Sequence, residues 1–169
     1  MKIAMNRNSR GFTLIEIVVV MVLISIIAAA TFSRSITTDQ INFVGQVDKI
    51  LNQIRYTKSL AMKRSQGDNT ERWGFRCTGN IYFLFHRINE VNSAPFRFPG
   101  EENDLITLSD LGVDMDSFIL YFDNLGRPYS GTTTNNLTVN LEIAISSEVD
   151  PTLERTIIIT PETGFIKIQ

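Results

Sequence analysis

The sequence predicts an α+β protein, in which a long N-terminal α-helix packs on a C-terminal head of antiparallel β-sheet. The helix is indicated by an unbroken apolar run over residues 12–32. It is also indicated by the absence of proline before Pro95 and by the presence of a single glycine, Gly45, between that run and Gly67. After Gly67 the chain changes to short β-type runs separated by turn residues, which is typical of a sheet.

The apolar run 12–32 contains one charged residue, Glu16. At about 1.5 Å per residue the run is long enough to cross a hydrocarbon core of about 30 Å, so we predict that it spans a membrane. A carboxylate inside such a helix costs roughly a few kcal/mol on insertion scales. Glu16 therefore indicates a function and requires a partner of opposite charge.

An amine partner for Glu16 arises if the chain is cut between Gly11 and Phe12. Phe12 would then carry a free α-amino group one helical turn from Glu16. Pairing of these two groups between neighbouring subunits would fix the register of one helix against the next. Residues 1–11 are predicted to be a cleaved leader that stays in the cytoplasm, because their charges are all positive. These charges belong to Lys2, Arg7 and Arg10.

We predict that the helix continues past the membrane segment to residue 66. Lys58, Lys63 and Arg64 would complement the helix dipole in its last turns, and Gly67 would end it. Apolar residues at three- and four-residue spacing predict the face that packs on the head. These are Ile41, Val44, Val47, Leu51 and Ile54. The residues expected on another face are Asp48, Asn52, Arg55 and Ser59.

Residues 67–169 are predicted to form the β-rich head. The expected strands are 81–85, 118–122, 138–145, 156–160 and 165–168. In the third of these, strict alternation places Val139, Leu141, Ile143 and Ile145 on one face. The last two strands are expected to form a hairpin through the turn residues 161–164.

Length and charge bound the class of protein. A chain of 169 residues provides one head beside the anchor, not two independent cores. Removing the three leader cations from the formal net charge of −2 leaves −5, which argues against a general nucleic-acid binder. The single cysteine, Cys77, excludes an internal disulfide. We find no hydrolase elbow, Cys-x-x-Cys pair or phosphate loop, and we expect no enzymatic activity, cofactor or metal.

The junction Gly11-Phe12-Thr13-Leu14-Ile15-Glu16 with its short basic leader resembles that of the type IV pilin and type II secretion pseudopilin family. The resemblance implies that a prepilin peptidase cleaves between Gly11 and Phe12 and methylates the new N-terminus of Phe12. It also implies that Glu16 guides assembly. The implied partners are other pilins or pseudopilins of the same filament, the peptidase, and an assembly platform in the inner membrane.

Two segments of the predicted head, residues 122–128 and 158–164, resemble those of the minor pseudopilin H and FimT-type subgroup. Major pilins commonly close a C-terminal loop with a disulfide, which a chain with one cysteine lacks. We therefore interpret the protein as a minor pseudopilin or minor pilin, with its N-terminus cytoplasmic, a single inner-membrane span and a periplasmic head. The alternatives are a principal filament subunit and a DNA-uptake minor pilin that binds DNA through its head.

Other candidate residues have simpler interpretations. We interpret the single histidine, His86, as satisfied or surface-exposed, not as a base or ligand, and Cys77 as a small packing residue. Calcium binds the heads of some pseudopilins, but the acidic residues here lack EF-hand spacing, and we interpret them as a solvated surface that follows a long loop over residues 89–104. These acids are Glu101, Glu102, Asp104, Asp110, Asp114 and Asp116.

Arginines and aromatic residues alternate in a way that could form a basic aromatic strip for nucleic acid. They are Arg72, Arg76, Arg87 and Arg97, with Trp73, Phe75 and Phe96. Ordinary strand alternation, with one face outward and one face inward, explains the same residues. The C-terminal hairpin offers only Lys167 as a cation, which argues against nucleic-acid binding.

Overall fold

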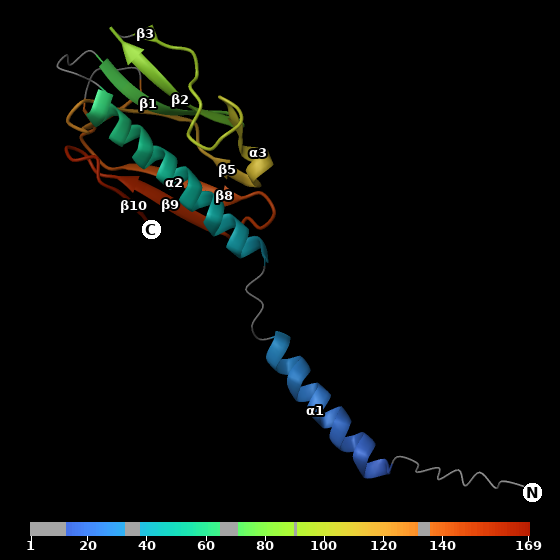
Figure 1. The fold of residues 1–169 in the computed structure, drawn as a ribbon. Helices are drawn as coiled ribbons and strands as arrows, with labels where there is room; N and C mark the ends of the chain where they lie inside the picture. The colour runs from blue at the N-terminus through green and yellow to red at the C-terminus, as the bar shows by residue number, and fades with distance from the viewer. Residues whose placement is uncertain (1–12, 33–37, 65–70, 90, 132–135) are drawn as a thin grey trace, which may run out of the picture. The chain divides into compact units, whose positions relative to one another are not determined.

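The computed structural model describes residues 13–32, 38–64, 71–89, 91–131 and 136–169. It divides into two compact units, Met1–Thr37 and Thr38–Gln169, which are described separately below (Figure 1). The first contributes one helix and the second contributes a helix with a β-rich head. The predicted α+β class is confirmed.

Helix α1, Leu14–Phe32, is the described element of the first unit. Its described side chains, at residues 13–28, are all exposed, and large apolar ones point outward around the whole helix. Across the described parts of the chain, none of the helices meets both the length and the apolarity that a membrane crossing requires. The predicted span 12–32 extends at both ends beyond the side chains that the structure describes, so the span stays a prediction.

Helix α2, Thr38–Arg64, carries one buried face, and Lys63 and Arg64 lie in its last described turn. The continuity of α1 with α2 and the predicted end at residue 66 fall on 33–37 and 65–70, which lie outside the described residues. The buried positions of α2 are Phe43, Val47, Ile50, Leu51, Gln53, Ile54, Thr57, Leu60 and Ala61.

The predicted packing face of α2 was wrong at its N-terminal end. Val47, Leu51 and Ile54 are buried, but Ile41 is 62% and Val44 is 43% exposed. The buried face follows the spacing that starts at Phe43, because the head covers that side of the helix. Ile41 and Val44 therefore form an apolar step on the uncovered side.

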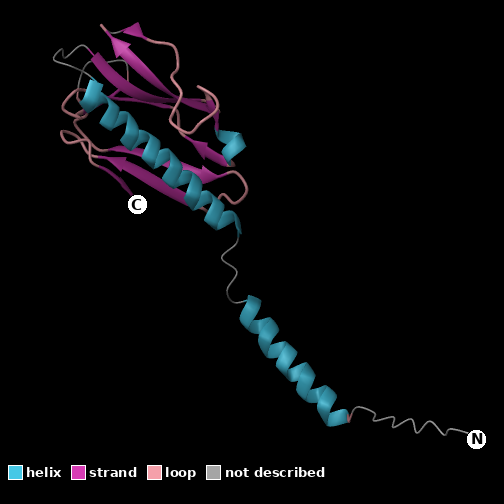
Figure 2. Ribbon diagram, in the orientation of Figure 1, coloured by secondary structure: helices cyan, strands magenta, loops and turns pink. Residues whose placement is uncertain are grey.

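The second unit contains two antiparallel sheets, so the predicted sheet is divided (Figure 2). The first sheet has the order β3-β2-β1-β6-β7, with β4 also paired to β2, and the second has the order β10-β9-β8-β5. The strands of the first sheet are β1 Glu71–Thr78, β2 Ile81–Ile88, β3 Val91–Asn92, β4 Ile106–Thr107, β6 Phe118–Phe122 and β7 Pro128–Ser130. The strands of the second are β5 Val113–Met115, β8 Leu141–Ser147, β9 Glu154–Ile159 and β10 Ile166–Ile168. A short helix, α3 Leu108–Leu111, precedes β5.

Four of the predicted strands are confirmed, β6 with the predicted ends and β2, β9 and β10 with shifted ends, and the last two form the predicted antiparallel hairpin. The strand predicted over 138–145 begins only at Leu141, and Val139 lies outside it with 70% of its surface exposed. The alternation was correct for Ile143 and Ile145, which are buried. The loop predicted over 89–104 is partly ordered against β2, through β3 and a bridge from Phe96 to Leu84.

One apolar core joins α2 to both sheets. Its fully buried members include Ile50 and Ile54 of α2, Phe75 and Leu120 of the first sheet, and Ile157 of the second. In Figure 1, α2 runs along the strands of both sheets. The inner faces of the two sheets are therefore held together through one side of one helix.

Strand β1 was not predicted, because its centre is a glycine with arginines on either side. The structure gives the reason for the glycine. Gly74 lies directly across from Phe85 on the outer face of the first sheet, and a Cβ at Gly74 would come within 2.2 Å of the Phe85 ring. The aromatic ring thus covers the glycine, which compensates for the weak strand propensity of that residue.

We predict that Gly74→Ala destabilises the head, since the Phe85 ring is buried and cannot move away without repacking. Overpacking of this kind costs about 1–3 kcal/mol and would lower the melting temperature by about 2–4 °C per kcal/mol. Gly45→Ala on α2 is the matched control, because nothing lies within 4 Å of its added Cβ. The control should be neutral or stabilising by up to about 1 kcal/mol. Thermal melts of both variants measure the difference, and equal melting temperatures would contradict the packing argument.

Candidate functional site

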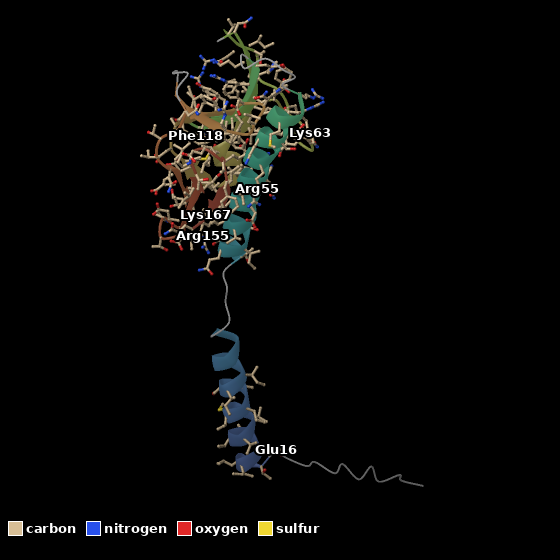
Figure 3. All side chains as sticks on the ribbon, turned by 90° about the vertical axis from the view of Figure 1, so that its left-hand side faces the viewer. Glu16, Arg55, Lys63, Phe118, Arg155 and Lys167 are labelled. Carbon is tan, nitrogen blue, oxygen red and sulfur yellow. The ribbon has the colours of Figure 1, made fainter. Side chains whose placement is uncertain are left out.

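Glu16 lies in the first turn of α1, which Figure 3 shows. Its backbone N–H donates to the hydroxyl of Thr13 at 3.4 Å and to the Thr13 carbonyl at 3.1 Å. Thr13 thus caps the helix, and the acid three residues later is favoured there by the positive end of the helix dipole. The side chain of Glu16 is exposed and forms no ion pair with any residue that the structure describes.

The predicted partner of Glu16 cannot be placed, since Gly11 and Phe12 lie outside the described residues. The surroundings of Glu16 are apolar. Leu14 is 80% and Ile15 is 67% exposed, and Ser25 is satisfied inside the helix by donating to the Met21 carbonyl at 2.8 Å. A helix that is apolar on all sides belongs in lipid or inside a bundle of other helices. Glu16 is therefore a charge at one end of a surface made for apolar packing.

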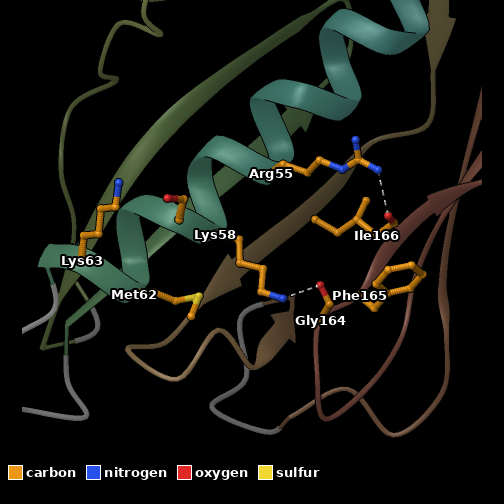
Figure 4. A pocket seen from close by; sticks show the side chains of 8 residues that line it. Arg55, Lys58, Met62, Lys63, Gly164, Phe165 and Ile166 are labelled. Atoms are coloured by element: carbon orange, nitrogen blue, oxygen red, sulfur yellow. Dashed lines mark hydrogen bonds between the residues drawn. The ribbon is translucent and has the colours of Figure 1, made fainter.

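A groove of about 510 Å³ lies in the second unit, between α2 and the C-terminal hairpin (Figure 4). It is lined by Arg55, Lys58, Ser59, Met62, Lys63, Gly164, Phe165 and Ile166. Two of its apolar side chains are largely open to solvent, Met62 at 52% and Phe165 at 59% exposure. Sequence reasoning missed this arrangement, because it assigned only Lys167 to the hairpin. The helical residues reach the hairpin from more than a hundred positions away in the chain.

The cations of this groove are used mainly inside the molecule. Lys58 donates through Nζ to the carbonyls of Thr163 at 2.8 Å and Gly164 at 3.0 Å. Arg55 donates through Nη2 to the Ile166 carbonyl at 3.3 Å (Figure 4). Burial lowers the pKa of Lys58. These hydrogen bonds join residues 163–166 of the hairpin to α2.

Residues 122–128 and 158–164, the two head segments considered in the sequence analysis, meet beside this groove. Gly126, at φ +75°, and Gly164, at φ +58°, lie in their respective turns. A Cβ at Gly164 would come within 2.5 Å of the Gly126 carbonyl oxygen, and a Cβ at Gly126 would come within 2.8 Å of Lys58 Cε. Glycine is needed at both positions because the turns touch and because left-handed backbone disfavours side chains.

The turn before β7 is organised by a buried carboxylate, Asp123, which is 1% exposed. One oxygen accepts from the backbone N–H groups of Leu125 at 3.0 Å and Arg127 at 2.9 Å. The other accepts from Arg127 Nε at 2.7 Å and from the Tyr129 hydroxyl at 3.1 Å. The hydrogen bond that Arg127 donates to Asp123 raises the pKa of Arg127, and burial raises the pKa of Tyr129. Every lone-pair direction of this carboxylate is therefore in use, as a buried charge requires.

His86 and Cys77 have the structural roles that were predicted. His86 Nε2 lies 2.7 Å from a carboxylate oxygen of Glu71, and its ring stacks on Trp73 with centroids 4.3 Å apart. Cys77 is buried, and burial beside Asp114 and Asp116 raises the pKa of its thiol to about 11. A thiol with this pKa stays protonated at neutral pH, which argues against a reactive nucleophile.

The acidic residues considered for a calcium site do not come together in the described part of the chain. Glu101 is paired with Lys49 Nζ at 2.8 Å and accepts from the Gln53 amide at 2.9 Å. Glu102 and Asp104 are exposed. Within the described ranges, no group of histidine, cysteine or acidic side chains is arranged to hold a metal ion.

The four arginines considered for a basic aromatic strip do not lie on one surface. Strand register places Arg72, Arg76 and Arg87 on the outer face of the first sheet, whereas the proposed aromatic partners Trp73 and Phe75 face the core. The aromatic residues that share the outer face are Phe83, Phe85, Tyr121 and Tyr129, with Ile119 beside them. Arg97 is exposed elsewhere. The alternative of a basic aromatic strip is therefore wrong in its aromatic members, and the favoured interpretation, strand alternation with one face outward and one face inward, is confirmed for β1.

Comparison with known proteins gives one family match. Residues 6–32 match the family model described as the prokaryotic N-terminal methylation motif, which is the signal of type IV pilin-like prepilins. No curated protein and no solved structure matches the chain. The motif supports a type IV pilin-like or pseudopilin subunit, and it points to a structural protein that assembles with other pilins after processing by prepilin peptidase.

We predict that Asp123→Asn destabilises the head by about 1–3 kcal/mol, because the new amide group would face donors on Arg127 and Tyr129 instead of accepting from them. Asp104→Asn, on an exposed loop position, is the matched control and should change stability by less than about 0.5 kcal/mol. Urea unfolding of the two variants at the same pH measures both values. A midpoint for Asp123→Asn equal to that of the control would show that the carboxylate does not hold this turn.

Proposed function

We propose that this protein is a minor pseudopilin or minor pilin, a structural subunit that helps to start, or caps, a type II secretion pseudopilus or type IV pilus. The observation that carries the proposal is the Gly11–Phe12 junction followed by α1, a helix that is apolar on every described side and carries Glu16 in its first turn. The methylation motif over residues 6–32 supports it. In this role the protein acts through packing and performs no catalysis.

We propose that processing and assembly of the protein begin in the inner membrane. Residues 1–11 stay in the cytoplasm, residues 12–32 anchor the chain, and the head faces the periplasm. Prepilin peptidase cuts between Gly11 and Phe12 and methylates the new amine. An assembly platform in the inner membrane then moves the subunit into a filament of other pilins.

The proposed role of Glu16 is to select the register of neighbouring helices. Apolar side chains slide against one another with little preference for position, whereas one buried charge accepts only one partner position. Pairing of Glu16 with the methylated amine of Phe12 on a neighbouring subunit satisfies both charges in a medium of low dielectric. Exposure of the described side chains of α1 leaves its surface open to such neighbours.

The exposed apolar step of α2 supports assembly in the same way. Ile41 and Val44 lie on the side of α2 that the head leaves uncovered. A helix of a soluble monomer has little reason to place them there, since burial of each such side chain contributes about 1.5–3 kcal/mol. We assign them to contact with helices of neighbouring subunits.

The minor role is favoured over a principal filament subunit because Cys77 is the single cysteine and is buried, so the head lacks the disulfide common in major pilins. A DNA-uptake role has less support. Arg55 and Lys58, which the fold brings to the hairpin, donate to its backbone carbonyls and are not free for phosphates.

Processing gives the first test. In cells with active prepilin peptidase, the mature protein should begin at Phe12 with a methylated amine, and intact-mass measurement detects this. Gly11→Leu should leave the precursor uncut, because a bulky side chain blocks close approach of the peptidase to the backbone. Val19→Leu within α1 is the control and should be processed normally. Recovery of a species that retains residues 1–11 in wild-type cells would remove the basis of the family assignment.

Assembly gives the second test. Glu16→Leu removes a charge from the helix, so membrane insertion and head folding should be unharmed. Crosslinking to other filament subunits should fall by at least about tenfold, since the α-ammonium of the neighbour would lose its partner. Glu16→Gln should show a similar loss, because an amide cannot neutralise the ammonium.

Val19→Leu serves again as the control at matched expression, and it should crosslink like the wild type. If Glu16→Leu crosslinks as well as the wild type while the mature N-terminus is still Phe12, the register role of Glu16 is wrong although the processing proposal stands. The two tests therefore separate the family from the mechanism.

A further inference from the structure

Two arginine side chains lie directly across from each other on the outer face of the first sheet. Arg72 of β1 and Arg87 of β2 are partners in the strand register, next to the pair formed by Gly74 and Phe85. Because the pairing is fixed by the ladder on both strands, the two guanidinium groups are held on one small area. Like charges directly opposite each other on a sheet are destabilising unless something compensates them.

Aromatic rings support both guanidinium groups from below. Arg72 Cζ lies 4.2 Å from the ring centroid of Tyr129 and 5.3 Å from that of Tyr121, and Arg87 Cζ lies 5.1 Å from the Tyr121 ring. The rings themselves are buried and stacked, with centroids 5.4 Å apart. Cation–π contact fixes the orientation of the two cations but provides no hydrogen-bond acceptor.

Neither guanidinium has a carboxylate partner among the described residues. The three ion pairs of those residues involve Lys49, His86 and Arg127. Arg87 is only 8% exposed, and the Nε atoms of both Arg72 and Arg87 are buried without a hydrogen-bond partner in the described part of the chain. Asp123, the carboxylate of the neighbouring turn, is already used by Arg127 and Tyr129.

This arrangement differs from that of the other charged groups that the fold buries. A buried donor without an acceptor costs free energy, and a buried cation without a counter-charge costs more. The terminal nitrogens of both guanidinium groups are not among the buried unpartnered atoms, so a ligand can reach them from outside. An anion at this position would supply the missing acceptors and the missing charge together.

We propose that Arg72 and Arg87 form a binding site for a carboxylate of another protein, an exposed glutamate or aspartate side chain. Two forked guanidinium groups on a rigid aromatic base match the planar geometry of a carboxylate. A single acidic side chain fits the charge of the molecule better than a polyanion does. The formal net charge of −2, or −5 without the leader, opposes long-range attraction of nucleic acid.

The site can be tested on the mature full-length chain in detergent micelles, with an end-capped hexapeptide that carries one glutamate among neutral residues as the probe. NMR observes the Nε–Hε groups of individual arginines. Saturable shifts are expected for Arg72 and Arg87 and none for the exposed Arg97. Arg87→Gln should weaken peptide binding at least tenfold, and Arg72→Lys should weaken it less, because charge is kept while the fork is lost. Arg97→Gln is the matched control and should bind like the wild type.

Two further probes, inorganic phosphate and a single-stranded oligonucleotide, distinguish the ligand class. Tighter binding of either one than of the peptide, per charge and at the same ionic strength, would overturn the carboxylate assignment. Absence of peptide-dependent shifts at Arg72 and Arg87, or equal shifts at all arginines, would overturn the site. The titration of the wild-type chain decides this even if Arg87→Gln fails to fold.

Discussion

The burial of one face of α2 is the interaction on which the head depends. Both sheets are covered on their inner sides by the same row of residues, which begins at Phe43 and includes Ile50 and Ile54. A sheet needs a hydrophobic face that is covered, and here the six-stranded and the four-stranded sheet both use the same helix for this. Loss of this face would therefore separate the two sheets from each other as well as from the helix.

The polar contacts of the head follow from this arrangement. Once α2 lies against both sheets, its Lys58 can reach the turn of the C-terminal hairpin, and the glycine turns at Gly126 and Gly164 are brought into contact. Asp123 then holds the neighbouring turn by four accepted hydrogen bonds from Leu125, Arg127 and Tyr129. The segments 122–128 and 158–164 therefore lie in contact, although they are distant in the sequence.

The sequence predicted the parts of the fold that local pattern controls. The helical stretches 14–32 and 38–64, the strand over 118–122 and the C-terminal hairpin follow from periodicity and turn residues, and they were found. Local pattern could not assign β1, since the glycine at its centre is explained only by the Phe85 ring on another strand. It also could not set the rotation of α2, because Ile41 and Val44 are as apolar as the residues that the head covers.

Whether a candidate site could be predicted also depends on whether its residues are close in the sequence. The Gly11, Phe12 and Glu16 motif is local, so it was identified from the sequence, and the methylation-motif match covers the same residues. The groove beside Phe165 and the pair of Arg72 and Arg87 depend on contacts between separate strands and helices. The arginines were noticed in the sequence, and strand alternation correctly separated them from Trp73 and Phe75, which face the core. Alternation could not name the aromatic residues of other strands that share their face.

The charged side chains of the described head differ in whether they have a partner of opposite charge. Buried Asp123 and the half-buried Glu101 and Glu71 each have a cation or histidine within 2.8 Å, so the fold provides partners for these carboxylates. Arg72 and Arg87 are the contrast, because two cations are held together on rings, and no described carboxylate pairs with them. The described apolar side chains of α1 and the step of Ile41 and Val44 are a second group, which is exposed to solvent. Apolar helices supply the larger part of association energy and little selectivity, whereas a paired charge contributes selectivity more than energy. In a subunit that joins others, the helices would therefore drive association, and the two arginines of the head would select which neighbour is accepted.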